Sequence, residues 1–146
     1  MKLPFRARAL ACAAVLALAA TAAPLPALAQ LAPIVAAAAN APVDQTGAVT
    51  VEVVAGVASQ KTYVTFAHIE ADGTGTIQFK YGNAGCGSGL VAAYGRAISL
   101  TAQTGFYGGG GIGPVIVVPL GKSLCLITTG AGVNFSGWLT QAQFPA

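Results

Sequence analysis

Residues 61–81, KTYVTFAHIEADGTGTIQFKY, contain the pattern that decides the fold. In the second half, Ile77, Phe79 and Tyr81 alternate with polar residues, and a period of two is typical of β-strands. The first half sorts in the same way into two faces, with Tyr63, Thr65, Ala67 and Ile69 on one and Val64, Phe66, His68 and Glu70 on the other. Between the halves, the DGTG sequence of residues 72–75 predicts a turn. We therefore expect an antiparallel hairpin here.

Short strand patterns continue on both sides of this segment. Residues 49–55 alternate, Val115–Val118 lies between two prolines, and Leu124–Ile127 follows a Gly-Lys turn. Along the last segment, the candidates for packing in the core are Val133, Phe135, Trp138 and Leu139. Seven or eight short strands without a helical period predict an all-β fold, a single small antiparallel β-sandwich, with a jelly roll as one arrangement of it. We expect Phe79 and Trp138 to be core residues.

The N-terminus has the three parts of a secretory signal peptide. They are the basic residues Lys2, Arg6 and Arg8, the apolar run Leu10–Ala20, and the small residues Ala27 and Ala29. We expect residues 1–29 to be removed, residues 30–48 to form a flexible N-terminal arm, and residues 49–146 to form the β-sandwich domain. The predicted location is secreted, periplasmic or at the cell surface, without a stable membrane span after cleavage.

The net charge of +3 comes from the signal peptide alone. In the remaining chain, the four basic residues Lys61, Lys80, Arg96 and Lys122 balance the four acids Asp44, Glu52, Glu70 and Asp72. This balance leaves no excess of basic residues to contact the phosphates of a nucleic acid, so we expect no nucleic-acid partner. A net charge near zero also permits self-association.

Two cysteines, Cys86 and Cys125, follow the predicted cleavage site. An exported protein meets an oxidising compartment, so we expect them to form a disulfide. A disulfide that closes the loop between these two cysteines would stabilise the fold by about 4 kcal/mol in the chain-entropy model. Two thiols and one distant histidine do not complete a zinc site, and we expect no metal and no cofactor.

The sequence Gly105-Phe106-Tyr107-Gly108 predicts a glycine-rich loop with two aromatic side chains. Aromatic side chains exposed between glycines bind sugars or partner proteins. The alternative is that Phe106 folds back into the core. Phe106, Tyr107 and Trp138 are the candidate binding residues, the last of them only if it lies on the surface, and the expected partner is a protein or a glycan.

The chain offers little for catalysis. His68 is its one histidine, and the nucleophile elbow G-x-S-x-G is absent. We predict no catalytic residues and a secreted, non-catalytic binding or structural module. The alternative from another class is a small extracellular hydrolase that uses His68 with Glu70 or Glu52, because a carboxylate beside an imidazole can support acid–base chemistry.

Four segments carry a resemblance: FKYGNAGCGSG at 79–89, SLTAQTG at 99–105, GGGIGPVIVVPLGKSLCLITT at 109–129 and FSGWLTQAQF at 135–144. They resemble a recurring type of small, uncharacterised bacterial, prophage and phage product. The resemblance implies a cysteine pair and a β-rich fold. It also leaves open a third role, that of a phage-derived structural module of a virion.

Overall fold

The computed structural model describes residues 38–111 and 113–145. The predicted signal peptide and the first part of the predicted arm lie outside these residues. The described chain forms ten strands and one 3-10 turn. Their bounds are β1 Ala39–Thr46, β2 Thr50–Val54, β3 Gln60–Ala71, β4 Gly75–Gly82, η1 Ala84–Cys86, β5 Val91–Ala92, β6 Ile98–Leu100, β7 Thr104–Gly109, β8 Ile116–Val118, β9 Ser123–Thr129 and β10 Asn134–Pro145.

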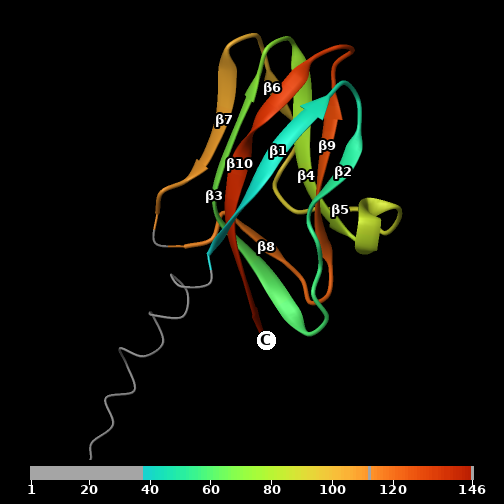
Figure 1. The fold of residues 1–146 in the computed structure, drawn as a ribbon, viewed down its shortest axis with the longest axis vertical. Helices are drawn as coiled ribbons and strands as arrows, with labels where there is room; N and C mark the ends of the chain where they lie inside the picture. Colours follow the sequence, from blue (N-terminus) through green and yellow to red (C-terminus); the bar gives the residue numbers. More distant parts are fainter. Residues whose placement is uncertain (1–37, 112, 146) are drawn as a thin grey trace, which may run out of the picture. The chain divides into compact units, whose positions relative to one another are not determined.

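The strands form two antiparallel sheets (Figure 1). Sheet A has the order β1-β10-β3-β7, and β8 also pairs with β3; sheet B has the order β2-β9-β4-β5, and β6 also pairs with β4. The pairs are nested along the chain: β1 pairs with β10, β2 with β9, β3 with both β7 and β8, and β4 with both β5 and β6. This nesting is the strand order of a jelly roll. The predicted antiparallel β-sandwich is thus confirmed.

The predicted hairpin at residues 72–75 is wrong. Strand β3 belongs to sheet A and β4 to sheet B, so the connection crosses from one sheet to the other. The corner is tight, because a Cβ on Gly75 would lie 2.2 Å from the carbonyl oxygen of Thr129 and 2.8 Å from the ring of Phe135. Local turn chemistry predicts that the chain reverses here, and the long-range partners of each strand decide to which sheet it returns.

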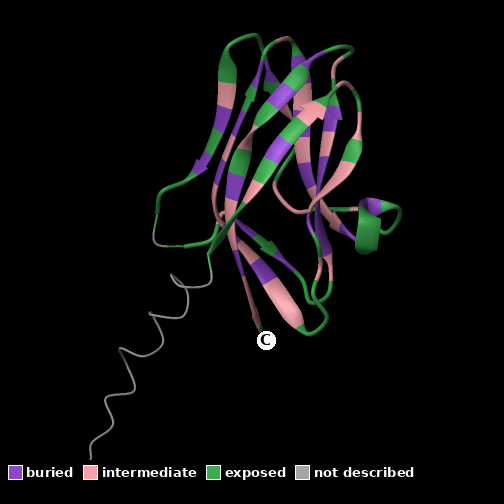
Figure 2. Ribbon diagram, viewed as in Figure 1, coloured by how far each residue is buried: buried purple, intermediate pink, exposed green. Residues whose placement is uncertain are grey.

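The core lies between the sheets and is built from alternate residues of the long strands (Figure 2). Its largest fully buried side chains include Phe79 from sheet B and Phe135 from sheet A. Burying side chains of this size contributes about 1.5–3 kcal/mol each. The prediction of Phe79 as a core residue is confirmed. Trp138 is not buried, because Phe135 and Leu139 alternate inward and place it on the opposite face.

A β-bulge in β3 interrupts its alternation. Thr140 pairs with Phe66, but the next residue, Gln141, pairs with Val64, which leaves Thr65 as the extra residue. As a result Val64 and Ala67 both lie in the core, although strict alternation put them on opposite faces. Phe66 and His68 follow the bulge and lie on the outer face of sheet A, opposite the buried Ala67 and Ile69.

Two segments predicted as irregular are strands. Ala39–Thr46, within the predicted arm, is β1 and buries Val43 against the core. Residues 104–109, predicted as a loop, are β7 and pair with β3 from Phe66 to Ala71. Glycine and alanine are poor predictors of strands, but the neighbouring strand supplies the hydrogen bonds and the core supplies the burial.

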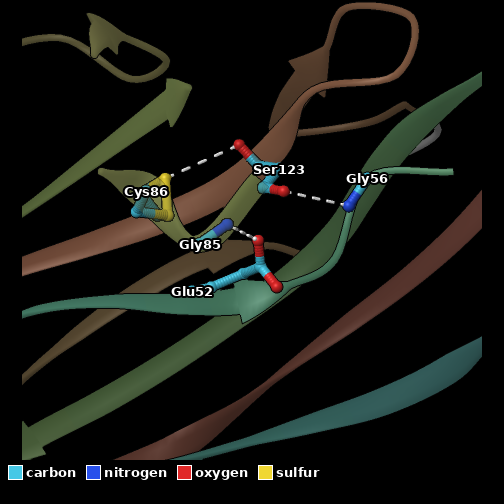
Figure 3. The surroundings of a disulfide bond; sticks show 6 residues. Glu52, Gly56, Gly85, Cys86 and Ser123 are labelled. Atoms are coloured by element: carbon cyan, nitrogen blue, oxygen red, sulfur yellow. Dashed lines mark hydrogen bonds between the residues drawn. A yellow bond between two sulfur atoms is a disulfide. The ribbon is translucent and has the colours of Figure 1, made fainter. Parts of the chain in front are cut away.

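The predicted disulfide between Cys86 and Cys125 is present, with a Cα–Cα distance of 5.9 Å. Cys125 lies on β9 in register with Glu52 of β2 and Lys80 of β4, on the outer face of sheet B. The disulfide fastens the η1 turn over this face, and the Glu52 carboxylate accepts a hydrogen bond of 2.6 Å from the backbone N–H of Gly85 (Figure 3). One end of sheet B is therefore covered.

Candidate ligand-binding site

The outer face of sheet A carries a line of ring side chains that crosses four strands in register. Pro42 of β1 pairs with Trp138 of β10, Trp138 with His68 of β3, and His68 with Tyr107 of β7. We call these four residues the aromatic row, because three of them are aromatic and the fourth is a proline at its end. Since neighbouring strands lie about 4.8 Å apart, the row is roughly 14 Å long. Trp138 is 43% exposed and Tyr107 is 64% exposed, so both rings are open to solvent.

His68 holds the row together. Its ring stacks on Tyr107 with centroids 4.3 Å apart and meets the Trp138 ring edge-on at 4.5 Å. Only 13% of its side chain is exposed. Phe66 adds a further contact, with its centroid 6.2 Å from that of Trp138. Rings in contact on several sides have few alternative rotamers, so the surface they form is ordered before any ligand arrives.

A glycine beside Trp138 allows the central strands to approach each other. A Cβ on Gly137 would lie 1.9 Å from the carbonyl oxygen of His68, so no other residue fits without moving β10 away from β3. Gly137 faces the inner side of the strand, between the buried residues Phe135 and Leu139. The close approach of backbones sets Trp138 and His68 within contact distance of each other.

One carboxylate, that of Glu70, is fixed beside the aromatic row, next to His68 and Tyr107. Oε1 of Glu70 accepts a hydrogen bond from the Tyr107 hydroxyl and another from Nε2 of His68, each 3.0 Å long. The hydrogen bond to Glu70 raises the pKa of the Tyr107 phenol above its usual value, and desolvation and the carboxylate charge act in the same direction. The Glu70 side chain is 54% exposed, so the fixed carboxylate remains accessible.

A polar row runs parallel to the aromatic row, two residues away from it on each strand. Asp44 of β1 pairs with Ser136 of β10, Ser136 with Glu70 of β3, and Glu70 with Gly105 of β7. We call Asp44, Ser136 and Glu70 the acidic row. Asp44 and Ser136 are both exposed. The face thus combines flat apolar rings with hydrogen-bonding oxygens beside them.

Of the three predicted binding residues, two lie together and one does not. Trp138 and Tyr107 are both in the aromatic row, on either side of His68. Phe106 is directed into the core, where its ring lies 5.7 Å from Phe79 and 5.5 Å from Tyr94. The expectation that Trp138 packs in the core is wrong, whereas the alternative for Phe106, that it folds into the core, describes its position.

Sequence reasoning missed the place of His68 and Glu70 in this surface. It considered them only as a catalytic pair and otherwise as a solvated strand end. The signal was present in the alternation of the strands, since His68 and Trp138 each fall opposite to the core residues of their own strand. What the sequence lacked was the pairing of β10 with β3.

The proposed catalytic groups are distributed over both sheets. His68 and Glu70 form a hydrogen-bonded pair on sheet A, whereas Glu52 lies on the outer face of sheet B and is bonded to Gly85. Glu52 therefore does not meet His68, and of the two acids only Glu70 lies beside the histidine. Within residues 38–111 and 113–145, no three His, Cys, Asp or Glu side chains lie close enough together to hold a metal ion.

The described part of the chain contains no helix that is long and apolar enough to cross a membrane. No protein-family model matches the chain, and neither a curated protein nor a solved structure matches it.

Proposed function

We propose that the protein is a non-catalytic binding module that acts outside the cytoplasm and binds glycans on the outer face of sheet A. The observation that carries this proposal is the exposure of Trp138 within an ordered row of rings. Tryptophan is among the most buried residues on average, and a large exposed ring on a rigid sheet is typical of a contact surface.

The chemistry of the face fits a sugar better than a purely apolar ligand. The C–H groups of a sugar ring pack on an aromatic face, and its hydroxyl groups need polar partners at the edge of that face. Trp138 and Tyr107 supply the rings, and Glu70, Asp44 and Ser136 supply the oxygens. A hydrogen bond to a charged carboxylate is stronger than one to a neutral acceptor.

The jelly-roll fold is compatible with this proposal but does not carry it. Jelly rolls occur in lectin domains and also in viral capsid proteins, so the fold alone does not separate a glycan-binding role from a structural one. The predicted secretion signal agrees with a ligand outside the cell. The side chains on the outer face of sheet A are what favour binding.

A panel of immobilised glycans tests the proposal. We expect the protein to be retained by at least one glycan, and Trp138→Ala to weaken that binding by about 30-fold, the effect of losing a central aromatic contact of about 2 kcal/mol. Val91→Ala is the control, because Val91 is a large exposed side chain of sheet B. Retention by no glycan, or unchanged binding by Trp138→Ala, would contradict the proposal.

The non-catalytic part of the proposal has its own test. The His68–Glu70 hydrogen bond is the one feature of the face that favours a hydrolase. We expect no turnover when the purified protein is screened against glycoside, ester and peptide substrates. Turnover that disappears in both His68→Ala and Glu70→Gln would show that this pair is catalytic.

A further inference from the structure

The acidic row gives the proposed glycan site a negative charge. Asp44 and Glu70 flank Ser136 on the same face of three neighbouring strands. The serine side chain is small, so the space between the two carboxylates is open above it. Given a strand spacing of about 4.8 Å, the two acidic positions lie roughly 10 Å apart. Trp138 is the next outward residue on β10, directly beside this opening.

Positive side chains lie elsewhere in the described residues. Lys61 is on β3 but seven residues before His68, roughly 23 Å along the strand. Lys80 belongs to sheet B, and Lys122 donates a hydrogen bond to Asn83 beside the disulfide loop. Arg96 lies between β5 and β6, two strands of sheet B. The potential over the aromatic row is therefore set by carboxylates, and it favours a cation and disfavours uronic acids and sulfated sugars.

Glu70 is prepared for such a ligand. Its Oε1 is already held by Tyr107 and His68, which fixes the direction of the carboxylate. A charged group held in place before binding loses little conformational freedom when the ligand arrives. A ring stacked on Trp138 would carry its substituents over Ser136, between the fixed carboxylate of Glu70 and that of Asp44.

We propose that the ligand is an oligomer or polymer of amino sugars whose amino groups are not acylated and carry positive charge. This inference rests on the proposed glycan-binding function and names the class of glycan. The aromatic row takes the ring faces, and the acidic row takes the ammonium groups. Neutral sugars bind the same rings without the ionic contribution.

Three hexasaccharides with the same β-1,4 linkage test the inference, since they differ only at carbon 2. The hexamer of glucosamine carries ammonium groups, that of N-acetylglucosamine carries acetamides, and that of glucose carries hydroxyls. Binding is followed by the fluorescence of Trp138, the one tryptophan of the chain. We expect the glucosamine hexamer to bind at least tenfold more tightly than the other two at low salt. The advantage should disappear near 1 M salt, where the screening length is about 3 Å.

Matched variants assign the effect to the acidic row. The double variant Asp44→Asn with Glu70→Gln should weaken binding of the glucosamine hexamer at least tenfold more than binding of the glucose hexamer, so that the advantage of the glucosamine hexamer disappears. Glu52→Gln removes one carboxylate charge from the other sheet and should have no effect. Thermal unfolding confirms that each variant is folded.

The outcomes separate this inference from the proposed function. Equal affinity for the three hexamers overturns the amino-sugar inference and leaves glycan binding supported. Failure of these hexamers and of the whole glycan panel overturns both. Binding of hexalysine as tight as that of the glucosamine hexamer, and lost in Trp138→Ala when both are measured by calorimetry, would overturn the inference in favour of a basic peptide.

Discussion

The outer faces of the two sheets differ in what they expose. On sheet B, the η1 turn is fastened over Cys125 by the disulfide, and Glu52 bonds to the backbone of the turn. The outward residues next to this region are Thr50, Ile127 and Gln78, which lie in register. On sheet A, no disulfide loop covers the described strands, and the outward residues at the centre are rings.

This difference indicates how the fold divides its tasks. The covered face uses a covalent bond and a charged hydrogen bond to stabilise a small domain. The open face presents its rings and carboxylates as a surface that solvent can reach. We infer that sheet B contributes stability and that sheet A contributes recognition.

The largest expected effect is on the free energy of unfolding, and it distinguishes a buried aromatic residue from an exposed one. Phe79 is fully buried between the sheets, so Phe79→Ala should lower the free energy of unfolding by about 3–5 kcal/mol. Trp138 is 43% exposed, and Trp138→Ala should lower it by only about 1 kcal/mol. Urea unfolding followed by circular dichroism measures both. Equal losses in the two variants would mean that Trp138 is structural, and the contrast between the faces would fail.

The next effect concerns the covered face. Replacing both Cys86 and Cys125 by Ala removes a crosslink between residues 39 apart in sequence and should lower the free energy of unfolding by about 4 kcal/mol. Glycan binding should not change under conditions where the variant is still folded, because the disulfide lies on the other sheet. Loss of binding by the folded variant would show that the two faces are coupled.

Much of the fold could be predicted from the sequence because it depends on local chemistry. Alternation located β2, β3 and β4, and the number of cysteines together with the expected export predicted the disulfide. The errors arose where a distant partner decides the structure. Ala39–Thr46 reads as a flexible arm and becomes a strand because β10 pairs with it along its whole length. Residues 72–75 read as a hairpin turn, yet their flanking strands pair in different sheets.

The candidate site shows the same division. Tyr107 could be chosen from the sequence, because aromatic side chains between glycines are typical of contact surfaces, whereas Trp138 is expected in the core and is a candidate only if exposed. Their contact through His68 could not, because it requires that β10, β3 and β7 lie side by side in one register. The bulge at Thr65 reverses only the face of the residues before it, so it misleads the assignment of Tyr63 and Val64 but not that of His68 and Glu70.

The smallest expected effect tests the order of the open face directly. The hydrogen bond from Tyr107 to Glu70 raises the pKa of the phenol, so its contribution to stability is present below the usual pKa near 10 and is lost as the pH rises through the folded-state pKa. Glu70→Ala removes both the acceptor and the charge, and should lower the pKa of Tyr107 towards its usual value. Carbon-13 NMR of the tyrosine Cζ atoms resolves this titration among the four tyrosines of the chain.

Glu52→Ala should leave the titration of Tyr107 unchanged, because Glu52 lies on sheet B. If the pKa of Tyr107 stays the same in Glu70→Ala, the Glu70 carboxylate is not held against the Tyr107 ring in solution. The outer face of sheet A would then lack the fixed carboxylate that distinguishes it from the outer face of sheet B.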